Sequence, residues 1–286
     1  MKENPAQNDS LAKRPIGIFD SGVGGLTVYR ALHERLPNER FVYLGDTARV
    51  PYGTKSLATV ERYALENSSF LASLGIKMLV VACNTASALA LPKIREKIGL
   101  DVVGVIGPGA RKAVAETQDK TVKPKIGVIA TEATILSDAY AEAIRRTGVE
   151  TEIFQAACPL FVPLAEEGWT SEAETYSIAK RYLSGMSAVD ALVLGCTHYP
   201  ILREVIQETV GPDVMLIDSG VAAAEETAQL LVEKNLANPD VIDSKERRLC
   251  DDLDHFYVTD AAERFARVAE RFLGVKPAKL EAIELI

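Results

Sequence analysis

Two cysteines in this sequence stand where a thiol could do chemistry. Cys83 and Cys196 each follow an apolar run that we expect to form a strand, and hydrogen-bonding side chains follow each of them. A thiol at the start of a helix feels the positive end of the helix dipole, which favours the thiolate. A lone cysteine in such a place is usually a small buried apolar residue, and we interpret Cys158 and Cys250 in that way. The matching settings of the other two favour a chemical role.

Two thiols on opposite sides of a ligand could support two kinds of reaction. They could form a disulfide redox couple. They could also invert a carbon stereocentre, because removing a proton from one face and returning one to the other requires two opposed acid–base groups. In that reaction a thiolate takes the proton while the opposite thiol gives one.

Polar residues follow several of the predicted strands. Four segments begin where an apolar run ends: 20–22, 83–85, 131–134 and 196–198. In open α/β sheets, ligands bind beyond the carboxyl ends of the strands and against helix N-termini. Glycines within 22–25 would let a small ligand approach backbone N–H groups, although this run lacks the spacing of a nucleotide-binding loop. We therefore expect a ligand site where these segments meet.

The elements that must position these residues are predicted from apolar periodicity. Short apolar runs rich in β-branched residues alternate with longer segments of helical period, a pattern typical of parallel strands covered on both faces. Strands are expected at 16–19, 41–44, 78–82, 102–106, 126–129, 151–154, 191–194 and 214–217. Helices are expected at 57–74, 132–147, 172–186, 201–210 and 221–236. The alternation predicts an α/β fold with open parallel sheets.

A faint internal repeat indicates two related halves. Segment 16–21 resembles 126–131, and 80–83 resembles 192–196 at nearly the same offset. Two pseudo-symmetric open parallel-sheet α/β domains would explain this repeat, with the active site in the cleft between them.

The boundary between these domains is expected near two glycine-containing segments. Residues 107–109 (GPG) are interpreted as a turn or hinge, and 218–220 (DSG) end a predicted strand. A late strand at 256–259 and a helix at 261–272 are expected to pack on the first half. The predicted division is one domain of 1–107 plus 220–286, which contributes Cys83, and a second of 108–219, which contributes Cys196.

Composition excludes several classes of protein. The 286 residues include 40 Asp and Glu against 32 Lys and Arg, a formal net charge of −8 that disfavours binding to nucleic acid or anionic lipid. The polar segment 1–14 lacks the apolar core of a secretion signal, and no apolar run is long enough to span a bilayer. We therefore expect a cytoplasmic protein. The cysteines show no metal-binding spacing, so no metal is expected.

Several short motifs, taken together, point to a family. They are 18–25 (IFDSGVGG), 45–53 (GDTARVPYG), 82–86 (ACNTA), 162–166 (VPLAE), 195–200 (GCTHYP) and 256–260 (FYVTD). In this order they resemble the glutamate racemases of the aspartate/glutamate racemase superfamily. The resemblance covers nearly the whole chain. It implies a cofactor-independent isomerase that interconverts L- and D-glutamate and supplies D-glutamate for bacterial peptidoglycan and the cell wall.

The resemblance also implies roles for individual residues. Cys83 would act on the D-enantiomer and Cys196 on the L-enantiomer, with Asp20 and His198 assisting the two thiols. Further active-site carboxylates implied in the same way are Asp46 and Glu166. The implied substrate contacts are Asp20, Ser21, Pro51, Tyr52, Gly53, Asn84, Thr85, Thr131, Thr134, Thr197 and His198. A homodimer and glutamate as the small-molecule partner are expected, without nucleic acid or membrane.

The residue types agree with such a ligand. Glutamate carries two carboxylates and one ammonium group, and its carboxylates require N–H and hydroxyl donors at helix starts. The sequence offers such donors at Ser21, Asn84, Thr85, Thr131 and Thr197. Asp20 could bind the ammonium group.

Several of these residues also have a purely structural interpretation. Asp20 could be a helix N-cap, and Asp46 could belong to an ordinary turn. Tyr52 could pack over the cleft, Glu166 could be a solvated loop carboxylate, and His198 could only hold its loop.

Removal of the α-proton of an amino acid is difficult without an electron sink. No lysine stands in a phosphate-binding context that would suit pyridoxal phosphate, so we expect desolvation by closure of the two lobes. The alternatives are a related racemase acting on aspartate, a non-enzymatic bilobal amino-acid-binding protein, and a thiol–disulfide protein.

Overall fold

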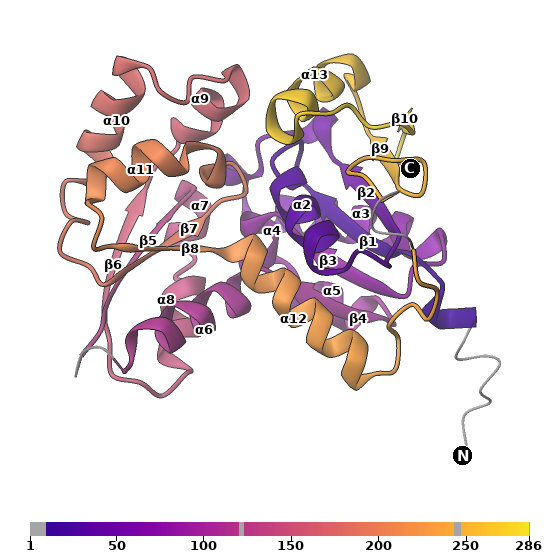
Figure 1. Ribbon diagram of the computed structural model, residues 1–286, viewed down its shortest axis with the longest axis horizontal. Coiled ribbons are helices and arrows are strands. Elements are labelled where there is room, and N and C mark those ends of the chain that lie inside the picture. Colours follow the sequence, from indigo (N-terminus) through magenta and orange to yellow (C-terminus); the bar gives the residue numbers. More distant parts are fainter. Residues whose placement is uncertain (1–9, 120–122, 243–246, 286) are drawn as a thin grey trace.

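Two parallel β-sheets form the framework of the protein (Figure 1). The structure is a computed structural model that describes residues 10–119, 123–242 and 247–285. The first sheet has the order β10-β9-β2-β1-β3-β4 and the second has the order β6-β5-β7-β8. All pairings in both sheets are parallel, which confirms the predicted fold class. We call the parts around these sheets the six-stranded half and the four-stranded half.

Except for β10, which no expected strand covers, the strands lie close to the positions that the apolar runs predict. The six-stranded half contains β1 (Ile16–Asp20), β2 (Phe41–Gly45), β3 (Met78–Val81), β4 (Asp101–Gly104), β9 (His255–Val258) and β10 (Leu280–Ala282). The four-stranded half contains β5 (Lys125–Ala130), β6 (Glu152–Ala157), β7 (Ala191–Gly195) and β8 (Met215–Asp218). Strands β1, β3 and β7 are buried along their whole length, as continuous apolar runs predict.

Helices cover both faces of the sheets. Those of the six-stranded half are α2 (Leu26–Arg35), α3 (Leu57–Ser73), α4 (Asn84–Leu89), α5 (Leu91–Lys97), α12 (Ser219–Glu233) and α13 (Ala262–Leu273). Those of the four-stranded half are α6 (Ile106–Thr117), α7 (Glu132–Leu136), α8 (Ala139–Arg145), α9 (Phe161–Glu167), α10 (Ala173–Leu183) and α11 (Arg203–Val210). Three short 3₁₀ turns complete the framework: η1 (Thr47–Arg49), η2 (Tyr52–Thr54) and η3 (Tyr199–Leu202).

Three sequence expectations about local structure are wrong. The expected turn at 107–109 lies inside α6, because a proline is tolerated in the first turn of a helix, where its missing N–H has no intrahelical partner. The expected strand 102–106 accordingly ends at Gly104. The single helix expected at 132–147 is interrupted at Asp138, which has a φ of 56° in the left-handed region.

Helix α12 joins the two halves. Figure 1 shows it running from the centre of the molecule toward the lower right, and it packs against both α2 and α6. One hydrophobic cluster also runs through both halves, and it contains Ile18 and Tyr29 on one side and Phe161 and Leu194 on the other. The domain boundaries at 107/108 and 219/220 stay predictions, but the core is continuous across them.

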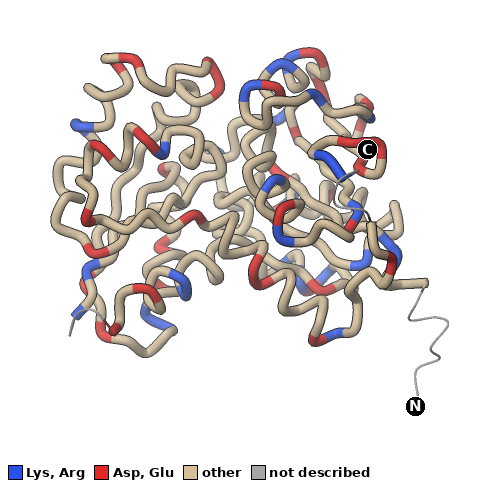
Figure 2. Tube along the Cα trace, viewed as in Figure 1, with Lys and Arg blue, Asp and Glu red and all other residues tan. Residues whose placement is uncertain are grey.

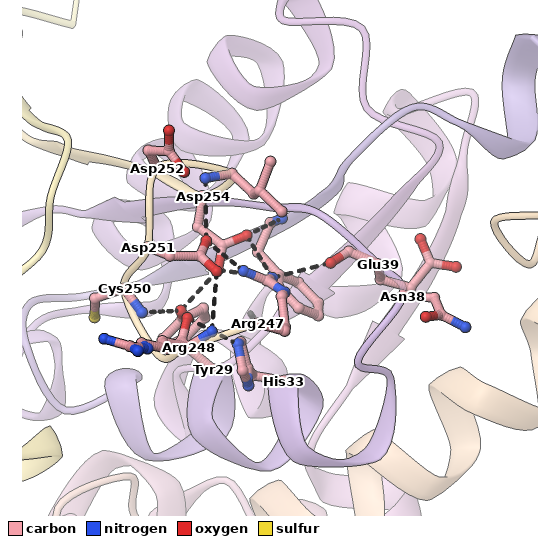
Figure 3. Close-up of polar contacts among 12 residues, drawn as sticks. Tyr29, His33, Asn38, Glu39, Arg247, Arg248, Cys250, Asp251, Asp252 and Asp254 are labelled. Atoms are coloured by element: carbon pink, nitrogen blue, oxygen red, sulfur yellow. Dashed lines mark hydrogen bonds and ion pairs between the residues drawn. The ribbon is translucent and has the colours of Figure 1, made fainter. Parts of the chain in front are cut away.

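A buried ion cluster anchors the segment that leads back to β9 (Figure 3). Nη2 of Arg247 donates to both carboxylate oxygens of Asp254 at 2.9 Å and to the backbone oxygen of Glu39 at 3.0 Å. The hydroxyl of Tyr29 donates to Asp254 at 2.7 Å, and so does the backbone N–H of Phe41 at 2.8 Å. These bonds fix the segment to α2 and β2, and β9 pairs with β2.

The surface carries charges of both signs. Figure 2 shows acidic and basic residues interspersed over both halves. Within the described residues, no helix is both long and apolar enough to cross a lipid bilayer.

Candidate active site

A pocket of about 210 Å³ lies between the two halves, beyond the carboxyl ends of β1, β3, β5 and β7. Parallel pairing places those ends at one edge of each sheet, so the segments that follow them converge. The predicted site residues that line this pocket are Ser21, Pro51, Tyr52, Gly53, Cys83, Asn84, Thr85, Thr131, Glu166, Cys196, Thr197 and His198. Three others, Asp20, Asp46 and Thr134, lie outside the lining.

Cys83 comes from the six-stranded half and begins α4. Its sulfur accepts a hydrogen bond from the N–H of Ala86 at 3.5 Å, and its S–H points to Oγ of Ser21 at 3.5 Å. Burial raises the pKa of Cys83 to about 12, and the Asp20 carboxylate adds to the shift. Without a ligand, this thiol is therefore protonated at neutral pH.

Cys196 comes from the four-stranded half and has a different electrostatic setting. Nδ1 of His198 lies 3.8 Å from the Cys196 sulfur, and Nε2 lies 3.2 Å from Oε1 of Glu166. Burial alone would lower the pKa of His198, but hydrogen bonds and charge interactions with Cys196 and Glu166 outweigh it and raise the pKa to about 10. Burial would raise the pKa of Glu166, yet His198 holds it below its ordinary value. An imidazolium next to the sulfur stabilises a thiolate.

Asp20 lies behind the pocket wall. Its Oδ2 accepts from the N–H of Gly22 at 2.9 Å, and within the described part of the chain Oδ1 has no hydrogen-bond partner. Burial raises the pKa of Asp20, while His198 and backbone N–H groups partly oppose that shift. Asp20 is not the helix N-cap that its position allowed, because Gly25 precedes α2 and the Asp20 carboxylate binds the N–H of Gly22 in the loop. The charge of Asp20 adds to the raised pKa of Cys83.

Hydroxyl and amide groups form the opposite wall. Oγ1 atoms of Thr85, Thr131 and Thr134 lie 3.0–3.2 Å apart from one another, so Thr134 supports the two that line the pocket. Oδ1 of Asn84 accepts from the hydroxyl of Tyr140 at 2.6 Å. The Nδ2 of Asn84 is buried without a partner in the described structure and is available to an acceptor on a ligand.

Asp46 supports the wall from outside. It accepts hydrogen bonds from Nε of Arg49 at 2.8 Å, from Oγ1 of Thr259 at 3.0 Å and from the hydroxyl of Tyr52. Tyr52 lines the pocket, so Asp46 holds a pocket residue in place and does not itself face the ligand space. Tyr52 thus packs against the pocket and also donates a hydrogen bond to Asp46.

Comparison with known proteins identifies the family. The sequence model of the Asp/Glu/hydantoin racemases matches residues 16–227. The chain belongs to the Asp/Glu/hydantoin racemase family. Within this family, a glutamate racemase of Geobacter metallireducens is 50% identical over 274 residues, which cover 95% of this chain and 97% of that protein. The resemblance that the motifs indicate is confirmed.

Solved structures of the family superpose over almost the whole chain. Glutamate racemase from Thermus thermophilus, in complex with β-chloro-D-alanine, is 42% identical with a TM-score of 0.83. That from Francisella tularensis, in complex with D-glutamate, is 40% identical with a TM-score of 0.85. Each alignment covers 96% of this chain and 98% of the other. An aspartate racemase from Picrophilus torridus, at 20% identity and a TM-score of 0.54, shares the fold alone.

Several residues around the pocket have no individual prediction from the sequence. Additional lining residues are Gly22, Val50, Thr54, Glu132, Pro159, Val162 and Pro163. Most of them stand within or next to the racemase-family motifs. Tyr140 and Arg264 lie outside those motifs and reach the site only through tertiary contacts. Among the described residues, no group of three or more His, Cys, Asp or Glu side chains could hold a metal ion.

One glycine in the expected ligand loop serves the contact between the halves. A Cβ atom on Gly24 would lie 2.3 Å from Oγ1 of Thr197 and 2.4 Å from the His198 ring. Oγ1 of Thr27 also donates to the backbone oxygen of Thr197 at 2.8 Å. The glycine therefore lets the loop after β1 approach the segment that carries Cys196.

Proposed function

We propose that this protein is a glutamate racemase that interconverts L- and D-glutamate through two thiols and without a cofactor. The observation that carries this proposal is the pair of cysteines, one from each half, on the wall of a single pocket. Membership of the racemase family and 50% identity to a glutamate racemase support it.

The surroundings of the two thiols suit one direction of proton transfer. The His198 ring, whose pKa is raised to about 10, lies 3.8 Å from the Cys196 sulfur, while burial raises the pKa of Cys83. We infer that Cys196 removes the α-proton of L-glutamate and that Cys83 delivers a proton to the opposite face. The reverse reaction exchanges the two roles. A deprotonated Cys83 is then stabilised by the ammonium group of the bound substrate, since an opposite charge nearby favours the charged form.

The polar groups of the pocket are suited to bind an amino acid that carries two carboxylates. We infer that Asn84 Nδ2 and the hydroxyls of Ser21, Thr85 and Thr131 donate to the substrate carboxylates. Asp20 acts indirectly, through the electrostatic potential at Cys83 and the loop that it caps. Glu166 acts through His198, and Asp46 acts through Tyr52.

The decisive experiment follows deuterium into the product. The protein is incubated with L-glutamate in D₂O, with circular dichroism reporting the loss of optical activity and NMR the α-proton. We expect racemisation with deuterium at the α-carbon, abolished in both Cys83→Ala and Cys196→Ala. Cys250→Ala, which removes a buried thiol outside the pocket, is the matched control and keeps the activity.

The same experiment separates the alternative functions. Activity on aspartate but not on glutamate would mean that the two-thiol mechanism is right but that the substrate is aspartate. Binding of glutamate without racemisation would favour a non-enzymatic binding protein. A disulfide between Cys83 and Cys196 after mild oxidation, found by mass spectrometry in protein that does not racemise glutamate, would favour the redox protein.

The family resemblance also supports proposals about the whole protein in the cell. We infer a cytoplasmic homodimer that supplies D-glutamate for peptidoglycan. Light scattering coupled to size-exclusion chromatography tests the dimer, because a mass near 31.0 kDa would contradict it.

A further inference from the structure

Helix α13 belongs to the six-stranded half, but two of its side chains reach α9 of the four-stranded half. Nη2 of Arg264 donates to Oε2 of Glu166 at 3.1 Å. Nη1 of Arg271 donates to the backbone oxygen of the same residue at 2.6 Å. Figure 1 shows the two helices facing each other at the top of the molecule. Both arginines therefore connect α13 to Glu166 of α9, but Arg264 binds its side chain and Arg271 binds its backbone.

The Glu166 carboxylate connects Arg264 to a reacting thiol. Its Oε2 faces Arg264, while its Oε1 faces Nε2 of His198 at 3.2 Å, and Nδ1 of His198 lies 3.8 Å from the Cys196 sulfur. The exposed fraction of the side chain falls along this path, from 61% for Arg264 through 23% for Glu166 to 9% for His198. The path thus leads from solvent into the pocket.

The surroundings of His198 leave Glu166 as its main orienting partner. Cys196 and Thr197 face the ring from its own segment, Asp20 contributes its charge from β1, and the Phe272 ring of α13 packs edge-on against it at 5.8 Å. Only Glu166 accepts a hydrogen bond from Nε2 among the described contacts.

We propose that Arg264 is a positioning residue for the half-reaction at Cys196. By binding one oxygen of Glu166, it holds the other oxygen against His198, and the imidazolium is thereby held against the sulfur. A partly exposed glutamate without this bond gains freedom to adopt rotamers that point into solvent, and those rotamers lose the contact with His198. The proposal rests on the proposed function, because only there does Cys196 act as a base.

The link also depends on how the halves are placed. Arg264 is in the half that carries Cys83, and Glu166 is in the half that carries Cys196. The ion pair forms only when α13 and α9 are as close as they are here. The proposed positioning of Glu166 therefore requires the arrangement of the two halves seen here.

The test compares Arg264→Gln with Arg271→Gln in the full-length protein without substrate. Iodoacetamide alkylates a thiolate with loss of iodide, so its rate at each cysteine reports thiolate population and access. Peptide mass spectrometry follows Cys196 and Cys83 in the same sample. We expect Arg264→Gln to lower the ratio of the Cys196 rate to the Cys83 rate by about threefold, as suits an exposed ion pair. Arg271→Gln is expected to leave this ratio unchanged.

A double-mutant cycle tests the route through Glu166. Glu166→Gln is expected to lower the ratio by itself, and Arg264→Gln added to it is expected to have no further effect. An unchanged ratio in Arg264→Gln would overturn the proposal, and so would an equal change at both thiols, which would mean a more open pocket. A further fall in the double variant would exclude action through Glu166. Because alkylation needs no substrate, these outcomes are independent of whether glutamate is racemised.

Discussion

At the scale of single residues, the environment of Asn84 shows how a bond outside the pocket orients a group inside it. The Tyr140 hydroxyl donates to Oδ1 of Asn84, a residue that lines the pocket, and this bond leaves Nδ2 as the unpaired group of the amide. An amide without that bond could rotate and present an oxygen to a substrate carboxylate. The orientation therefore depends on a residue of α8 that does not touch the ligand space.

We predict that Tyr140→Phe raises the KM for glutamate about three- to tenfold, the cost of one hydrogen bond. Steady-state polarimetry with each enantiomer measures it. Enantiomers have equal free energies in water, so kcat/KM must fall by the same factor in both directions, which provides an internal check. Tyr176→Phe, which removes an exposed hydroxyl bonded to Glu208, is the matched control. An unchanged KM in Tyr140→Phe would contradict this role for the bond.

His198 should make stability depend on pH. The pKa of His198 is raised from 6.5 to about 10 in the folded protein, so the imidazolium stabilises the fold fully below about pH 6.5. That contribution is lost as the pH rises through about 10. We expect the difference in free energy of unfolding between the wild type and His198→Gln to shrink over this range. Urea titrations at several pH values measure it, and a difference independent of pH would show that His198 is not charged in the fold.

At the scale of elements, Asp46 joins four parts of the chain. It follows β2 and accepts from Arg49 of η1, Tyr52 of η2, Asn67 of α3 and Thr259 after β9. The pocket wall at 50–53 leads from η1 into the single turn of η2, and the carboxylate adds side-chain hydrogen bonds to the few that the backbone makes there. The wall is therefore rigid although it has few backbone bonds of its own.

We predict that Asp46→Asn destabilises the protein by about 2–4 kcal/mol, because it leaves buried donors without their charged partner. Glu66→Gln is the matched control. It removes an ion pair to the same Arg49 from a half-exposed position and should cost less than about 1 kcal/mol. Urea unfolding of both variants measures the difference. Equal costs would mean that Asp46 contributes no more than a surface charge.

At the scale of the whole molecule, the pocket and the core both span the two halves. The core cluster is continuous between them, and α12 packs on helices of each. A ligand that contacts both halves should stabilise them together. The single tryptophan, Trp169, follows α9 in the four-stranded half and reports on that half alone.

We expect Trp169 fluorescence and far-ultraviolet circular dichroism to show one coincident unfolding transition. Glutamate at a hundred times its Kd should raise the free energy of unfolding by about 2.7 kcal/mol in both signals, since it binds only the folded state. Aspartate at the same concentration is the ligand control. Separate transitions, or a shift in only one signal, would mean that the halves unfold independently and that the ligand holds just one of them.

Most of the strands and the reactive side chains of the pocket can be recognised from the sequence alone. Buried parallel strands require continuous apolar runs, so β1, β3, β5 and β7 are visible in the sequence, and the polar residues after them follow from chain direction. The sequence predicts that Cys83 and Cys196 act together, because similar residues surround each of them along the chain. Most residues that line the pocket belong to motifs located at the ends of strands.

The residues that support the pocket indirectly could be found only in the folded protein. The start of α6 at 106 was hidden because Gly-Pro-Gly has the composition of a turn, and packing against α8 and α12 overrides it. Asp46, Tyr140 and Arg264 act through contacts with residues far along the chain. Such contacts leave no local pattern, because they depend on where separate elements meet in space and not on the residues that neighbour them in sequence.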